Sequence, residues 1–202
     1  MSSSPRLAAA PATGPVSIAP WPETLEARRE AEVQLARLYA DLTAQDSATA
    51  ALQAWCDRMG GGVAAPIRAV RTAGAEAASD VEARSRLGVG RQAPLRYRHV
   101  RLMWGERVLS EADNWYRPDL LTPAMNQALD ETETPFGVAV RSLGYHRATL
   151  SAERLWRPLD QAGRIPAAIL RCEAVLSLGD GTPFSLVVET YRDQALFAPA
   201  VA

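Results

Sequence analysis

Residues 169–191 have the sequence ILRCEAVLSLGDGTPFSLVVETY. Two apolar stretches, residues 169–178 and 184–191, flank the segment Gly179-Asp180-Gly181-Thr182. Apolar runs of this length are typical of β-strands, and a short glycine-containing segment between two of them is typical of a hairpin. The sequence therefore predicts an antiparallel pair of strands in this part of the chain.

A single carboxylate, Glu189, interrupts the second of these strands. An ionised side chain in a half-buried strand costs free energy unless a charged or hydrogen-bonding partner meets it. Glu189 has two interpretations at this point. It either has a structural role, at the surface or in an ion pair with an arginine, or it contacts a ligand.

The rest of the chain predicts further strands and several helices. A second hairpin is expected around Gly105-Glu106, and residues 72–90 are ambiguous between helix and loop. The two strands of this second hairpin are expected at residues 96–104 and 107–115. Two further strands are expected at residues 67–70 and 145–151.

The helices are expected mainly in the first part of the domain. Trp21-Pro22-Glu23 is a typical helix start, and a second helix is expected from Asp46 or Ser47 to Gly60. A short helix should follow Thr122-Pro123. Helices followed by hairpin-linked strands favour an α+β fold with an antiparallel sheet of about six strands.

The composition indicates one domain. The chain has 202 residues, of which 48% are hydrophobic, and a net charge of -1. We expect a disordered leader at residues 1–20, a single domain at 21–195 and a tail at 196–202. No nucleic-acid partner and no membrane insertion are expected. The leader matches a signal peptide weakly, so a cytoplasmic location is expected, with export as the alternative.

Residue usage excludes several kinds of chemistry. All 22 basic residues are arginine, so Schiff-base chemistry and a lysine general base are excluded. The two cysteines and two histidines lack the spacing of metal ligands, and no metal is expected. Anions must be recognised by arginine or by backbone amides.

Three segments are candidates for anion recognition. Asp46-Ser47-Ala48-Thr49 places a helix N-terminus after a loop, and Thr134-Pro135-Phe136-Gly137 forms a second cap-like turn. Arg98 lies in an apolar strand and could offer a planar fork to a carboxylate. Each also has a plain interpretation, as a helix cap, a tight turn or a surface charge respectively.

Taken in order with residues 105–118 and Glu189, these segments resemble the chorismate pyruvate-lyase family, over roughly residues 35–195. The resemblance implies a carbon–oxygen lyase of ubiquinone biosynthesis that converts chorismate to 4-hydroxybenzoate and pyruvate without a cofactor. It also implies a six-stranded antiparallel sheet with a buried site under helical flaps. We expect a monomer.

The resemblance also assigns roles to residues. Arg98 would pair with the aromatic carboxylate, and Ala48 and Phe136 would supply backbone amides to it. Glu189 would hydrogen-bond the ring hydroxyl and make the catalytic proton contact, as base, acid or orienting group.

One departure from the family concerns the second carboxylate of chorismate. Where the family has A-G-R, residues 111–116 have the sequence EADNWY, so Asp113 or Asn114 replaces the arginine. Arg117 and Arg147 are candidates to compensate, and we take Asn114 and Arg147 as the candidate contacts. The alternative function is a non-catalytic aromatic-acid binding protein, a sensor or carrier, on the same fold.

Overall fold

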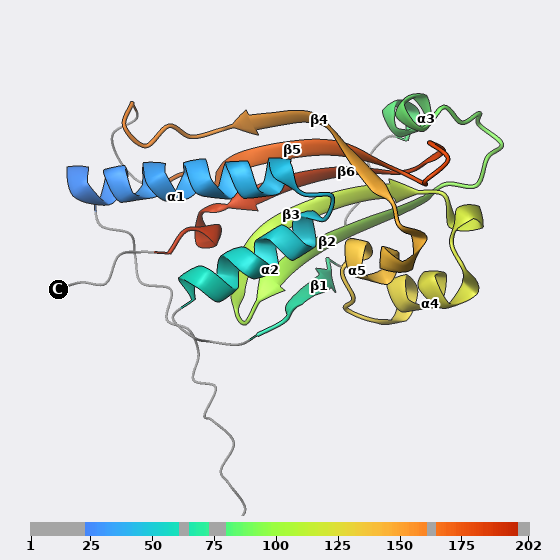
Figure 1. Ribbon diagram of the computed structural model, residues 1–202, viewed down its shortest axis with the longest axis horizontal. Coiled ribbons are helices and arrows are strands. Elements are labelled where there is room, and N and C mark those ends of the chain that lie inside the picture. Colours follow the sequence, from blue (N-terminus) through green and yellow to red (C-terminus); the bar gives the residue numbers. More distant parts are fainter. Residues whose placement is uncertain (1–22, 61–64, 73–79, 161–164, 198–202) are drawn as a thin grey trace, which may run out of the picture.

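The computed structural model describes residues 23–60, 65–72, 80–160 and 165–197. These residues form an α+β domain around one six-stranded antiparallel sheet, with strand order β1-β2-β3-β6-β5-β4 (Figure 1). The prediction of fold class is confirmed. The strands are β1 (Ile67–Arg71), β2 (Arg96–Trp104), β3 (Arg107–Tyr116), β4 (His146–Arg154), β5 (Ala168–Ser177) and β6 (Pro183–Arg192).

Both predicted hairpins are present, as the pairs β2–β3 and β5–β6. The pair β3–β6 joins the two hairpins in the middle of the sheet, with Ala112 opposite Glu189. The edge strand β4 ends at Arg154 rather than at residue 151 as predicted. Its register shifts between Thr149 and Ser151, and such a bulge makes a strand harder to delimit from its apolar pattern.

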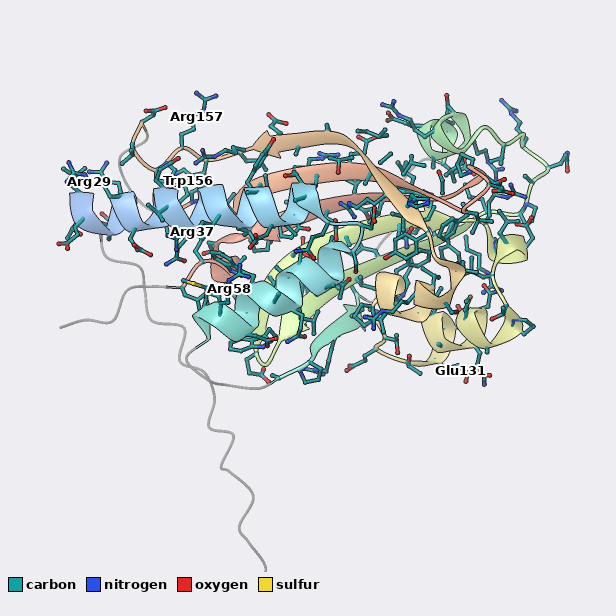
Figure 2. All side chains as sticks on the ribbon, viewed as in Figure 1. Arg29, Arg37, Arg58, Glu131, Trp156 and Arg157 are labelled. Atoms are coloured by element: carbon teal, nitrogen blue, oxygen red, sulfur yellow. The ribbon has the colours of Figure 1, made fainter. Side chains whose placement is uncertain are left out.

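Two antiparallel helices, α1 (Leu25–Ala44) and α2 (Ala48–Met59), cover one face of the sheet (Figure 1). Of the predicted helix start Trp21-Pro22-Glu23, the first two residues lie outside the described part of the chain, and Glu23 precedes the helix, which begins at Leu25. Thr24 is the N-cap, because its hydroxyl accepts a hydrogen bond from the Ala27 amide at 3.1 Å. Exposed arginines, among them Arg29 and Arg37, lie on the outer surface of this helical layer (Figure 2).

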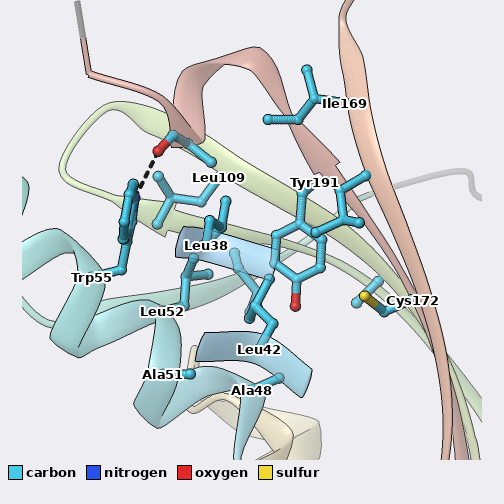
Figure 3. Packing of buried hydrophobic residues seen from close by; sticks show 14 of the residues in the cluster. Leu38, Leu42, Ala48, Ala51, Leu52, Trp55, Leu109, Ile169, Cys172 and Tyr191 are labelled. Atoms are coloured by element: carbon cyan, nitrogen blue, oxygen red, sulfur yellow. Dashed lines mark hydrogen bonds between the residues drawn. The ribbon is translucent and has the colours of Figure 1, made fainter. Parts of the chain in front are cut away.

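The main core lies between these helices and the sheet (Figure 3). Leucines recur at helical spacing along α1 and meet Leu52 and Trp55 of α2 and Tyr191 of β6; the α1 leucines are Leu35, Leu38 and Leu42. Burying each such side chain contributes about 1.5–3 kcal/mol. This amphipathic pattern is the reason why α1 and α2 pack where they do.

Smaller helices pack at one end of the sheet. The helices α4 (Pro123–Glu131) and α5 (Phe136–Ala139) form a second apolar cluster with Tyr116 and Phe184. On the other face of the sheet, α3 (Val81–Leu87) packs on Trp115 and Leu186. This helix lies in the segment that the sequence left ambiguous, of which residues 73–79 are outside the described part.

The chain after β6 packs back on the domain through the 3-10 turn Asp193–Ala195. The Trp55 indole N–H donates a hydrogen bond to the Ala195 carbonyl at 2.8 Å (Figure 3). Arg107 donates hydrogen bonds to the carbonyls of Gln194 and Leu196. The packed part of the domain therefore includes Leu196. In the described ranges, no helix has the length and apolar character needed to cross a membrane.

Candidate functional site

A cavity lies between the helix-covered face of the sheet and the first turns of α2 and α5. It holds about 510 Å³ of space free of protein atoms, part of it open to solvent. The cavity brings together six residues that the sequence selected: Ala48, Arg98, Asn114, Phe136, Arg147 and Glu189.

Arg98 presents an incompletely bonded guanidinium to the cavity. It lies on β2 and is 4% exposed, and its Nη2 donates to the Thr134 carbonyl at 3.2 Å. Its Nε and Nη1 atoms have no hydrogen-bond acceptor among the described residues. Burial, reinforced by the nearby charge of Arg71, lowers the pKa of Arg98 to about 10. The site therefore holds a positive charge that is short of acceptors.

The N-terminus of α2 adds further donors. Ser47 is the N-cap, and its Oγ accepts from the Ala50 amide at 3.2 Å. The amides of Ala48 and Thr49, in the first turn, have no intrahelical acceptor, because a helix leaves its first amides unpaired. With the positive end of the helix dipole, they favour an anion at this point of the cavity.

The turn at the start of α5 comes very close to the start of α2. A Cβ atom placed on Gly137 would lie 2.9 Å from the Tyr145 hydroxyl and 3.4 Å from Ser47 Oγ. Tyr145 and Ser47 are hydrogen-bonded through their side chains, and burial raises the pKa of Tyr145. Phe136, beside this glycine, stacks on Phe184 with a ring separation of 6.2 Å. Glycine thus lets the two turns meet without displacing the Tyr145 hydroxyl.

A buried ion pair lies elsewhere in the cavity wall. Arg147 Nη2 donates to Glu189 Oε2 at 3.0 Å, and each side chain is 5% exposed. Burial acts to lower the pKa of Arg147, but its charge and hydrogen-bond interactions, chiefly with Glu189, leave that pKa above its ordinary value. Arg147 therefore remains a cation whose charge is matched within the protein.

The structure also separates Asp113 from Asn114. Asp113 points to the opposite face of the sheet, where its Oδ1 accepts from Tyr97 at 2.6 Å and lies 2.8 Å from His99 Nδ1. Asn114, in contrast, lines the cavity. Arg117 does not line the cavity and pairs with Asp119.

Apolar side chains form the remaining walls. They come from the inner faces of β2, β3, β5 and β6 and are Val100, Leu102, Ala112, Leu176 and Val187. The sequence did not single out these residues or Tyr145 as site residues, although Tyr145 is the first residue of the strand predicted at residues 145–151. Within the described ranges, no group of three or more His, Cys, Asp or Glu side chains is placed to hold a metal ion.

Comparisons with known proteins give one sequence relative and a structural class. No family model matches the sequence. The chain is 43% identical over 197 residues to the uncharacterized protein y4mC of Sinorhizobium fredii, covering 89% of this chain and 82% of that protein.

The structure is similar to the effector domain of PhnF from Mycobacterium smegmatis, with a TM-score of 0.50, 15% identity, and coverage of 78% of this chain and 94% of that domain. It matches a longer PhnF chain with the same TM-score and identity, covering 78% of this chain and 68% of that one. These similarities show the chorismate lyase-like fold.

Proposed function

The chain belongs to the family of the Sinorhizobium fredii protein y4mC, and we propose that it binds a small aromatic carboxylic acid in the cavity beside α2 and α5. The proposal rests chiefly on the state of the Arg98 side chain. Its guanidinium is buried, and its Nε and Nη1 atoms have no acceptor among the described residues. A ligand carboxylate would accept from one of these atoms and offset the cost of burying the charge.

The surroundings of Arg98 favour a carboxylate on a flat, apolar body. The first amides of α2 line the same cavity and can donate to the same anion. The floor is apolar and includes the small side chain of Ala112, and the aromatic ring of Phe136 forms part of the wall. An aromatic ring fits such walls without leaving polar groups unpaired.

The fold offers a further, weaker support. The PhnF structure that it resembles is called an effector domain. On this analogy the chain would act as a sensor or carrier that binds its ligand without changing it. The analogy concerns the fold only, so the chemistry of the ligand rests on Arg98 and its neighbours.

Calorimetric titration of the purified protein with benzoate and with 4-hydroxybenzoate tests the proposal. We expect binding that is lost in Arg98→Met. The matched control is Arg101→Met, since Arg101 lies on the same strand, is half-exposed and pairs with Glu111 outside the cavity. Absence of binding, or equal binding by the Arg98→Met variant, would refute the proposed site.

A chorismate lyase is the second candidate function, and the position of Glu189 favours it. Glu189 lies in the cavity wall as the resemblance requires. The reaction would break a ring C–O bond, release enolpyruvate, and remove a proton from the adjacent ring carbon to form the aromatic ring. Enolpyruvate would then take up a proton to give pyruvate, and Glu189 would make the proton contact.

Two features favour binding over this reaction. Arg147, the remaining cation for the second carboxylate of chorismate, is already paired with Glu189. Asn114 brings no charge to the place of the family's arginine. Incubation with chorismate decides the matter: formation of both products, lost in Glu189→Gln, would support the lyase, and product no faster than spontaneous decay would exclude it.

A further inference from the structure

We propose that the bound acid carries a hydroxyl oxygen next to its carboxylate, as in 2-hydroxybenzoate, and that Asn114 selects for this oxygen. The inference rests on the proposed function and names the ligand class more closely. It starts from the side-chain amide of Asn114, which is 3% exposed and lines the cavity. Its Oδ1 accepts from Ser185 Oγ at 2.6 Å, whereas its Nδ2 has no acceptor among the described residues.

Asn114 is placed to act on the same ligand group as Arg98. The two residues are direct cross-strand partners in β2 and β3, and both side chains line the cavity. The Cα atoms of such partners lie about 4.5–5.5 Å apart. A ligand oxygen that meets Asn114 can therefore lie beside the carboxylate that meets Arg98.

Both residues offer donors, and this sets the chemistry of the ligand. The unbonded polar atoms of Arg98 and Asn114 are all nitrogens that carry hydrogen. A hydroxyl beside a carboxylate on an aromatic ring donates its own proton to that carboxylate. Its oxygen lone pairs then remain free to accept from Asn114 Nδ2, so no ligand proton is left without an acceptor.

The charges in the cavity favour a single carboxylate on this ligand. Among the described residues that line the cavity, Arg98 has no carboxylate in an ion pair with it, whereas the charge of Arg147 is matched by Glu189. Asp46 also lines the cavity and adds a negative charge there. Asn114 is neutral and cannot compensate a second carboxylate. The oxygen that Asn114 selects is therefore a neutral one, and a dicarboxylate would leave one charge unmatched in a buried place.

Two matched ligand pairs test the inference by calorimetry. The first pair is benzoate and 2-hydroxybenzoate, and the second is 4-hydroxybenzoate and 2,4-dihydroxybenzoate. In each pair the added 2-hydroxyl should tighten binding about five- to tenfold, the value of one net hydrogen bond. Absence of a gain in both pairs would overturn the inference.

Variants assign the gain to Asn114. Asn114→Leu, which is similar in size, should remove the difference in affinity between each acid and its 2-hydroxy counterpart. Ser185→Ala is the control, because it removes the hydrogen bond between Ser185 and Asn114 but keeps the Asn114 side-chain amide. This variant should still bind the 2-hydroxy acids more tightly than their counterparts. A gain that persists in Asn114→Leu contradicts the inference even if the wild-type protein prefers 2-hydroxybenzoate.

The results separate the two proposals. If benzoate binds in an Arg98-dependent manner but the 2-hydroxyl adds nothing, the role of Asn114 is refuted and the aromatic-acid site stands. If none of the four acids binds, both proposals fall. Thermal unfolding of each variant, compared with wild type, verifies that a loss of binding does not arise from loss of the fold.

Discussion

Arg147 and Glu189 form an ion pair that spans three strands of the sheet. Arg147 lies on the edge strand β4 and Glu189 on the central strand β6, with β5 between them. Arg147 is opposite Leu176 of β5 and Glu189 is opposite Cys172, so the pair runs diagonally over β5 near Ala174. A small residue at this place lets two long side chains meet across a strand.

Breaking this ion pair should destabilise the protein strongly. Glu189→Leu leaves the Arg147 charge buried without its partner, and we expect the free energy of unfolding to fall by about 3–5 kcal/mol. The double variant Arg147→Met, Glu189→Leu should lose less than either single variant, since no buried charge remains. Chemical denaturation of the four proteins measures both effects.

The control for this prediction is an exposed pair. Arg68 and Glu133 lie 2.8 Å apart with side chains 43% and 51% exposed. Glu133→Gln should change the free energy of unfolding by less than about 1 kcal/mol. Additive losses in the double variant of the buried pair would contradict the coupling between Arg147 and Glu189.

The buried charge of Arg98 should lower the free energy of unfolding, although the same charge makes binding of the aromatic acid possible. Burial lowers the pKa of Arg98 to about 10, which corresponds to a cost of about 3 kcal/mol for keeping it charged in the folded state. Arg98→Met should therefore raise the free energy of unfolding, by about 1–3 kcal/mol, while aromatic-acid binding is lost. A variant that unfolds more easily than wild type would show that Arg98 has a structural role.

The affinity for benzoate should depend on pH through Arg98. Benzoate stays ionised from pH 6 upward, and Arg98 must be protonated to bind it. Because the pKa of free Arg98 is about 10, the affinity should be constant up to about pH 9 and fall toward tenfold per pH unit above 10. Calorimetric titration with benzoate at several pH values between 7 and 10.5 measures this dependence of the affinity on pH.

The destabilising effect of the Arg98 charge on the folded protein should decrease as the pH rises. From about pH 10 upward, the unfolded chain binds more protons at Arg98 than the folded protein does, because folding lowers the pKa of Arg98 to about 10. The cost of burying this charge is therefore fully present below pH 10 and is relieved as the pH rises. An affinity that does not change up to pH 10.5 would argue against Arg98 as the anion contact.

Gly137→Ala should weaken binding more than it weakens the fold. The new Cβ atom would lie 2.9 Å from the Tyr145 hydroxyl, at the end of a side chain that can shift, so the two turns would separate slightly. We expect affinity to drop about tenfold, with a loss of about 1 kcal/mol in the free energy of unfolding. Gly137→Ala combined with Tyr145→Phe, which removes the hydroxyl, should recover part of the affinity.

Gly60→Ala provides the matched comparison. Its Cβ would lie 2.3 Å from the ring of Trp104, which is fully buried and cannot move aside. Gly60 does not line the cavity, so this variant should lose stability and keep the affinity of the protein that remains folded. The reverse pattern in the two glycine variants would be inconsistent with the cavity as the binding site.

Much of the site could be predicted because it depends on local patterns. Ser47 precedes a helix, Phe136 follows a cap-like turn, and Arg98 and Glu189 interrupt apolar strands. Each of these signals lies within a few residues of sequence. The structure places all four segments around one cavity.

The choice between Asp113 and Asn114 depends on features that the local sequence does not carry. Alternation of apolar and polar residues normally identifies the buried face of a strand. In β3 this signal is lost, because α3 covers Trp115 on the outer face while Tyr116 is buried on the inner face. The register of β3 against β2 and β6, set by the assembled sheet, decides that Asn114 points inward.

The attachment of α2 has a consequence for how fast a ligand enters. The hydrogen bond from Trp55 to Ala195 joins α2 to the segment that follows β6, and Glu189 of β6 lies in the cavity. We therefore expect this wall helix and this strand to move together. Phe136 of α5 is held by ring contacts with Tyr116 and Phe184, which can slide without breaking a hydrogen bond. We expect α5 to be the gate, so Phe136→Leu should change the association rate, measured by stopped-flow mixing, more than the equilibrium affinity.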